Sequence, residues 1–116
     1  MELACRAPNV IILHPSRDLY ACYVSRVDPL AGSQWSAPGT VDGFARSAPN
    51  AVLMAFAEQE LKRSGGGRVL DLGCGAGRNT LPLARLGWNV VGIGLSWPML
   101  SAAANRVVLV GQHQSG

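Results

Sequence analysis

The sequence predicts an α/β fold with a parallel sheet. Its 116 residues, of which 48% are apolar and 15% charged, suffice for one small globular core. From residue 48 onward, short apolar strands alternate with helices, which is the pattern of a parallel sheet joined by crossover helices. A glycine-rich turn, Gly73-Cys74-Gly75-Ala76-Gly77, connects the first of these strands to the helix after it.

Residues 1–47 have no such regular pattern and are interpreted as an irregular N-terminal extension. Two short apolar runs at 10–13 and 19–24 are able to pair with each other as strands. Runs this short are equally compatible with loop segments anchored on a core. We therefore expect the extension to cover the core, as a helix or as a hairpin.

The first regular element is a helix over residues 49–63. Ser47 or Asn50 can cap its N-terminus, and Gly65 follows the basic residues at its end. The apolar residues of this segment fall on one helical face and predict that it packs against the sheet: Val52, Leu53, Phe56, Ala57 and Leu61.

The remaining elements follow at short intervals. The sequence predicts a strand at 68–72, a helix at 79–86 and a second strand at 89–93. Ser96 caps a third helix, whose first turn contains Pro98. Residues 107–110 are apolar enough for a third strand, and residues 111–116 form a polar tail.

Charge and cysteine content exclude several classes of function. The net charge is +3, but the basic residues are scattered and form no basic stripe, which disfavours nucleic acid as a partner. The three cysteines form no CxxC pair and only two histidines accompany them, so we expect no metal site, reduced thiols and a cytoplasmic location. No apolar stretch reaches the roughly 18 residues of a membrane span, and we expect no membrane contact.

The glycine-rich turn is the motif that carries chemistry. Glycines between a strand and a helix let the backbone approach a ligand and direct helix N–H groups at it. The dinucleotide fingerprint would need glycine or alanine where this chain has Arg78. An NAD(P)-dependent oxidoreductase fragment therefore remains as the alternative.

The string over residues 69–77, with Asp71 two positions before the first glycine, resembles motif I of class I S-adenosylmethionine-dependent methyltransferases. The string over residues 90–100 resembles the second motif of that family, and the resemblance covers about residues 49–106. It implies a Rossmann-like three-layer α/β/α unit that is incomplete, with the first two or three strands of the methyltransferase fold. Residues 48–110 would then form a partial nucleotide-binding domain.

The resemblance also implies a cofactor and its site. S-adenosylmethionine would be the cofactor, and the glycine-rich turn would wrap its amino-acid end, with Asp71 near the ammonium group. Leu95 and Met99 would flank the adenine or the ribose. The cofactor-binding residues implied in this way are Asp71, Gly73, Cys74, Gly75, Gly77, Gly94, Leu95 and Met99. No residue can be nominated as a catalytic base.

Gly94 departs from the family pattern. Members of the family have an acid there that accepts hydrogen bonds from the ribose hydroxyls, and no acid follows Asp71 in this chain. The loss of such a bond costs about 1.5–3 kcal/mol. The sequence therefore predicts weak cofactor binding.

The short length of the chain also predicts how the chain behaves alone. The family's next strand would pair beside residues 68–72, so we expect this strand to have an open edge that can pair with a second copy. We expect a fragment that is weak or inactive alone and favours a small-molecule methyl acceptor, or a non-catalytic binding or dimerisation module. Trp35, Phe44 and Arg46 would cover the core or form a lid over the cofactor.

Overall fold

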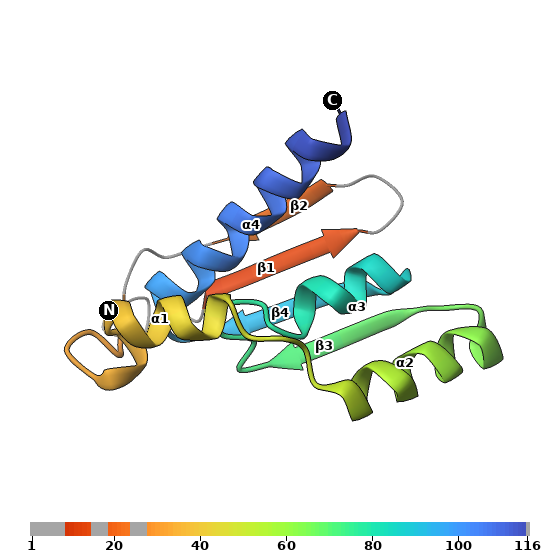
Figure 1. Ribbon diagram of the computed structural model, residues 1–116, viewed down its shortest axis with the longest axis horizontal. Helices are drawn as coiled ribbons and strands as arrows, with labels where there is room; N and C mark the ends of the chain where they lie inside the picture. Colours follow the sequence, from red (N-terminus) through yellow and green to blue (C-terminus); the bar gives the residue numbers. More distant parts are fainter. Residues whose placement is uncertain (1–8, 15–18, 24–27, 116) are drawn as a thin grey trace, which may run out of the picture.

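The computed structural model describes residues 9–14, 19–23 and 28–115 (Figure 1). Their elements follow in the order β1 (Asn9–His14), β2 (Leu19–Tyr23), a short 3-10 helix η2 (Gln34–Ser36), α1 (Pro38–Ala45), α2 (Ala51–Ser64), β3 (Arg68–Leu72), α3 (Thr80–Leu86), β4 (Asn89–Gly94) and α4 (Trp97–Ser115).

The strands form one four-stranded sheet in the order β2-β1-β4-β3. The two strands predicted at 68–72 and 89–93 are confirmed, and β3 and β4 pair in parallel. The apolar runs of the extension also pair with each other, and β1 continues the sheet by pairing antiparallel to β4. The α/β class is therefore confirmed, but the sheet is mixed and not parallel throughout.

Helix α2 is confirmed, but part of its predicted packing is wrong. The Asn50 side chain caps it by accepting a hydrogen bond from the Leu53 N–H at 3.0 Å. Val52 and Phe56 do not pack against the sheet, since they are 81% and 61% exposed. The reason is that α2 packs on α3 and on Trp88, whose Nε1 donates to the Ala57 carbonyl at 3.3 Å.

The predicted third strand at 107–110 is also wrong, because these residues lie inside α4. Ser96 caps this helix as expected, since its Oγ accepts a hydrogen bond from the Met99 N–H at 3.3 Å. Neither proline nor glycine occurs between residues 99 and 110, so nothing stops the helix before the apolar run.

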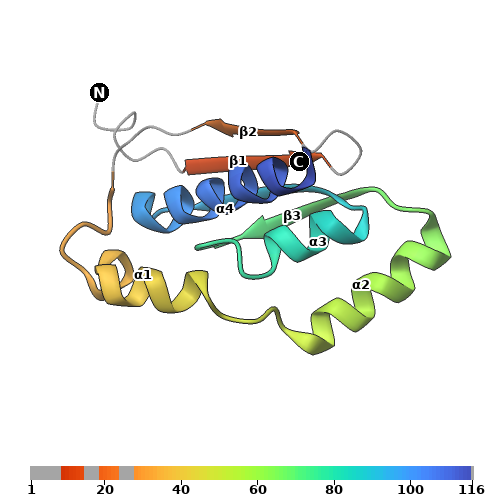
Figure 2. The ribbon, with the colours of Figure 1, turned by 45° about the horizontal axis from the view of Figure 1, so that its top comes forward.

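The core lies between one face of the sheet and the helices α3 and α4, which lie in front of the strands in Figures 1 and 2. Because side chains alternate between the two faces of a strand, Ile11, Leu13 and Val90 share this covered face. They pack with residues of α3 and α4: Leu81, Leu83, Leu100 and Ala103.

The opposite face of the sheet is apolar and largely open. Its residues form cross-strand rows, one of which joins Ile12, Val91 and Leu70. Ile12 is 43% exposed, and Leu70 and Leu72 on β3 are 59% and 72% exposed. Among the residues that the structure describes, the helices thus cover one face of the sheet, and the expected third layer is not formed.

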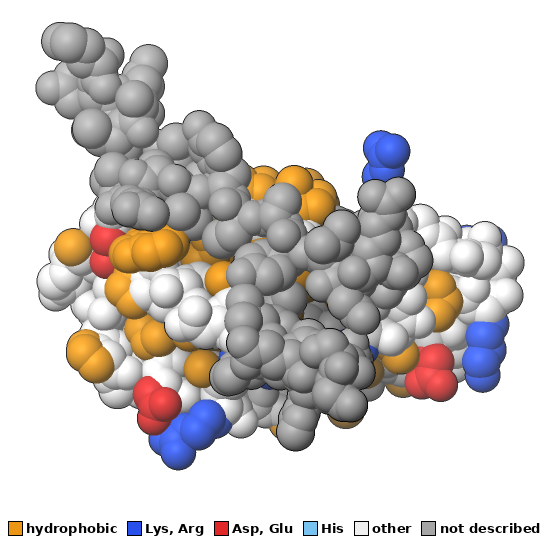
Figure 3. All heavy atoms as spheres, turned by 90° about the horizontal axis from the view of Figure 1, so that it is seen from above, with side chains coloured by type: hydrophobic (Ala, Val, Ile, Leu, Met, Phe, Trp, Pro, Cys, Tyr) orange, Lys and Arg blue, Asp and Glu red, His pale blue; other side chains and the backbone are white. Residues whose placement is uncertain are grey.

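Where the described residues are visible in Figure 3, hydrophobic side chains appear in several patches and charged side chains are few. None of the described helices combines the length and the apolar character that a membrane crossing requires.

Candidate functional site

The glycine-rich turn lies between β3 and α3, as the sequence predicts. Gly73, Gly75 and Gly77 have φ angles of 71°, 55° and 81°, in the left-handed region that favours glycine. A Cβ atom on Gly77 would also lie 3.0 Å from the Cβ of Ala103, so this position has no room for a side chain. The loop therefore depends on glycine for its conformation and for its packing against α4.

Hydrogen bonds fix the loop to the end of β4. The N–H groups of Gly73 and Cys74 both donate to the Ile93 carbonyl, at 2.7 and 3.0 Å. The Cys74 side chain is buried and packs beneath the loop. The loop is thus held at the edge of the sheet where the two parallel strands end.

Asp71 has a partner that the sequence analysis missed. The Thr80 hydroxyl donates to Asp71 Oδ2 at 2.6 Å, and Thr80 is fully buried at the start of α3. Arg78 does not pair with Asp71 in this structure but donates from Nε to the Ala48 carbonyl at 2.6 Å. The second carboxylate oxygen of Asp71 accepts no hydrogen bond from the described residues, and it can serve a ligand.

The other predicted site residues gather at the same edge. Gly94 ends β4 and is buried against the loop, because a Cβ atom there would lie 3.7 Å from Cys74 Sγ and 3.8 Å from the Gly75 nitrogen. Met99 is buried, and its Sδ lies 3.9 Å from the corresponding Cβ position of Gly75. Leu95 is 47% exposed beside them. The structure therefore brings all eight predicted positions to one edge, while their role in binding stays a prediction.

Helix α4 adds a contact from the far side of the loop. Arg106 Nη1 donates to the Ala76 carbonyl at 3.3 Å. Burial lowers the pKa of Arg106 from its ordinary value, and the charge of Arg85 lowers it further. Through its hydrogen bond to Ala76, the guanidinium group holds the loop against α4.

The N-terminal segment reaches the same edge of the sheet. Trp35 and Phe44 form a tilted aromatic pair with their ring centroids 6.3 Å apart, and Trp35 is 49% exposed. Ser36 Oγ lies 2.9 Å from Ser96 Oγ at the start of α4. Arg46 instead forms an exposed ion pair with Asp42, at 2.7 Å.

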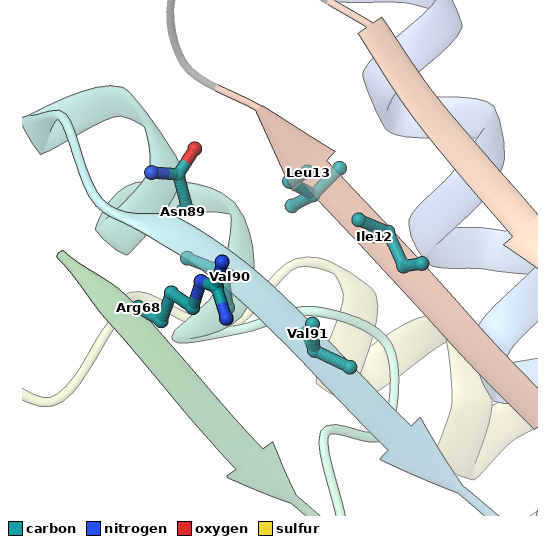
Figure 4. Close-up of a pocket in the computed structure, with 6 residues that line it drawn as sticks. All are labelled: Ile12, Leu13, Arg68, Asn89, Val90 and Val91. Atoms are coloured by element: carbon teal, nitrogen blue, oxygen red, sulfur yellow. The ribbon is translucent and has the colours of Figure 1, made fainter.

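A hollow of about 270 Å³ lies at the other end of the strands (Figure 4). Arg68 and Asn89, which begin β3 and β4, line it together with residues of β1 and β4. It is therefore separate from the glycine-rich edge. Among the described residues, no group of three His, Cys, Asp or Glu side chains lies close enough together to hold a metal ion.

Comparison with known proteins links this edge to a family. Residues 69–113 match a family described as a methyltransferase domain. A putative methyltransferase of Geobacillus sp. (strain WCH70) is 38% identical over 65 residues, which are 53% of this chain and 26% of that protein. The ubiquinone biosynthesis O-methyltransferase of Bradyrhizobium diazoefficiens is 32% identical over 98 residues, which are 77% of this chain and 39% of that protein.

A third relative is named for a different methyl acceptor, 23S rRNA. The 23S rRNA (uracil(1939)-C(5))-methyltransferase of Burkholderia thailandensis is 52% identical over 54 residues, or 47% of this chain and 12% of that protein. The chain thus spans well under half the length of each of these relatives. No solved structure matches the chain.

Proposed function

The chain is related to the class I S-adenosylmethionine-dependent methyltransferases, and from this premise we propose that it is the cofactor-binding part of such an enzyme. The observation that carries the proposal is the loop over residues 73–77, which bends from β3 into α3 through left-handed glycines and faces the end of β4. Dinucleotide binding is the less favoured alternative, because the similar proteins are methyltransferases.

The residues at this edge suit S-adenosylmethionine in charge and in hydrogen-bonding capacity. A carboxylate attracts an ammonium group, and Asp71 is held in place by Thr80 with one oxygen left for a ligand. A Cβ added to Gly75 would meet Met99 Sδ at the ordinary contact distance of 3.9 Å, so Met99 lies directly against this glycine. The Gly75 N–H donates to no described residue and is available to a ligand carboxylate.

Most of the catalytic work in this proposal is positioning. When bound, S-adenosylmethionine supplies an activated methyl group on its sulfonium. Asp71 and the loop hold the amino-acid end, while Leu95 and Met99 lie where they can flank the nucleoside. A methyl acceptor must then be held in line with the methyl group. We propose no catalytic base among the described residues, and we expect the chain alone to be weak or inactive in transfer.

Isothermal titration calorimetry with S-adenosylhomocysteine tests the cofactor. We expect measurable binding, and Asp71→Asn should weaken it about 10-fold or more, because the ammonium loses its charged partner. Asparagine keeps an acceptor for the Thr80 hydroxyl, and Glu58→Gln on the exposed surface of α2 is the matched control. Binding of NADH without binding of S-adenosylhomocysteine would favour the oxidoreductase alternative.

A binding or dimerisation module is the second candidate, because β3 lies at the edge of the sheet next to the open apolar face. For the enzyme, we propose a small-molecule acceptor, since the basic residues form no stripe that would suit nucleic acid. The cysteine pattern favours the reducing cytoplasm.

A further inference from the structure

The end of β4 lacks the carboxylate that a bound nucleoside would use. Vicinal ribose hydroxyls are commonly recognised by an Asp or Glu that accepts their hydrogen bonds. Gly94 offers no side chain at this point, and no acid occurs after Asp71 in the sequence. Among the residues that the structure describes, an acid that serves the ribose would have to lie in a segment before β3 or in β3 itself.

The N-terminal segment brings such an acid to this edge. Asp28 Oδ1 accepts hydrogen bonds from the Ser36 hydroxyl at 3.0 Å and from the Leu30 N–H at 3.2 Å. Ser36 Oγ is in turn 2.9 Å from Ser96 Oγ, and Ser96 follows Gly94 by two residues. Asp28 is thus connected through the hydroxyl group of Ser36 to that of Ser96, which caps α4.

The direction of each hydrogen bond in this chain can be assigned. The carboxylate of Asp28 only accepts, so Ser36 uses its single hydroxyl proton toward Asp28. Ser96 must then donate to Ser36, while Ser96 Oγ accepts from the Met99 N–H at 3.3 Å. The contact between Ser96 Oγ and the Trp35 carbonyl, at 3.5 Å, is too long to compete.

This arrangement fixes one oxygen of Asp28 and leaves the other available. Oδ1 is held by two donors, whereas Oδ2 accepts no hydrogen bond from the described residues. We propose that Asp28 supplies the carboxylate that β4 lacks and accepts hydrogen bonds from the ribose hydroxyls of the bound nucleoside. The inference rests on the proposed function, and it makes Asp28 a determinant of specificity for ribose.

The test compares S-adenosylhomocysteine with its 2′,3′-dideoxy analogue by calorimetry on the full chain. The unaltered protein should prefer the ribose form by about 10- to 150-fold, the range of one charge-assisted hydrogen bond. Asp28→Asn should bring this ratio close to one with little change in affinity for the dideoxy ligand. Asp42→Asn, which removes an exposed acid from the same N-terminal segment, should leave the ratio unchanged.

A second variant separates recognition from folding. Gly94→Asp should restore the ribose preference in the Asp28→Asn background, because a Cβ at Gly94 meets its nearest atoms at ordinary contact distances of 3.7 and 3.8 Å. The inference is overturned if Asp28→Asn weakens both ligands equally, or if it leaves the ratio unchanged. If the unaltered protein binds neither ligand, the proposed function fails together with the inference, whereas ribose-independent binding overturns the inference alone.

Discussion

Gly92 and Gly94 lie two residues apart on the covered face of β4, but their surroundings differ. A Cβ atom on Gly92 would lie 3.0 Å from three atoms at once, the Cβ and Sγ of Cys74 and the Cγ2 of Ile11. At Gly94 the nearest atoms would be 3.7 and 3.8 Å away. Close packing therefore requires glycine at position 92, whereas position 94 has room for a Cβ atom.

This difference predicts opposite effects of the same substitution. Gly92→Ala should lower the free energy of unfolding by about 1–3 kcal/mol, because the packed core must shift to admit a methyl group. Gly94→Ala should be neutral or raise it by up to about 1 kcal/mol, since a less flexible unfolded chain favours folding. Urea denaturation followed by circular dichroism measures both, and equal losses would contradict this account of the loop packing.

At the level of residues, sequence reasoning could find the site only where the signal is local. Asp71 and the glycines stand together in the sequence, so their pattern predicts a strand-to-helix loop. Thr80 and Asp28 were missed because their partners, Asp71 and Ser36, are nine and eight positions away and nothing local marks the pairing. Such contacts depend on how the elements pack.

Helix α2 has two apolar sets that the sequence could not separate. Leu53, Met54 and Leu61 pack against the core, whereas Val52 and Phe56 point away from it. The spacing of the apolar residues shows how wide the apolar face of α2 is. It does not determine which neighbouring element that face contacts. The choice is made by α3 and Trp88, which α2 meets in place of the sheet.

Two substitutions in α2 should therefore differ in their effect on stability. Phe56→Ser should change the free energy of unfolding by no more than about 0.5 kcal/mol, because the ring is mostly in solvent. Leu61→Ala should cost roughly 2 kcal/mol, near the low end for a core leucine, because this side chain is only partly buried. Thermal or urea unfolding would distinguish them, and a large loss for Phe56→Ser would show that the ring is buried in solution.

The strands and α4 show the same division between local and non-local information. The hydrophobic runs at 68–72 and 89–93 gave the positions of β3 and β4. The run at 107–110 is also apolar but becomes helical, because it continues the helix that Ser96 caps. The pairing of β1 with β4 joins segments about 80 residues apart, and no local pattern indicates it.

The molecule as a whole has a sheet that its described helices cover on one face. On the other face Ile12, Leu70 and Leu72 are exposed, and β3 has one edge without a partner strand among the described residues. Exposed apolar strands at an edge favour pairing with another chain. The sequence anticipated the open edge, whereas the open face became evident only from the register of the strands and the position of the helices.

We therefore predict that the chain associates with itself in a concentration-dependent way through β3. Leu70→Lys should shift sedimentation velocity profiles toward the monomer, because a charge on the edge strand would have to be desolvated in the interface. Gln59→Lys adds the same charge on the exposed surface of α2, away from β3, and should leave association unchanged. A monomer at every concentration, or equal effects of the two lysines, would show that β3 is not the contact surface. Addition of S-adenosylhomocysteine should not disperse the assembly, since the glycine-rich loop lies beyond the C-terminal end of β3 and the exposed Leu70 side chain lies on the open face.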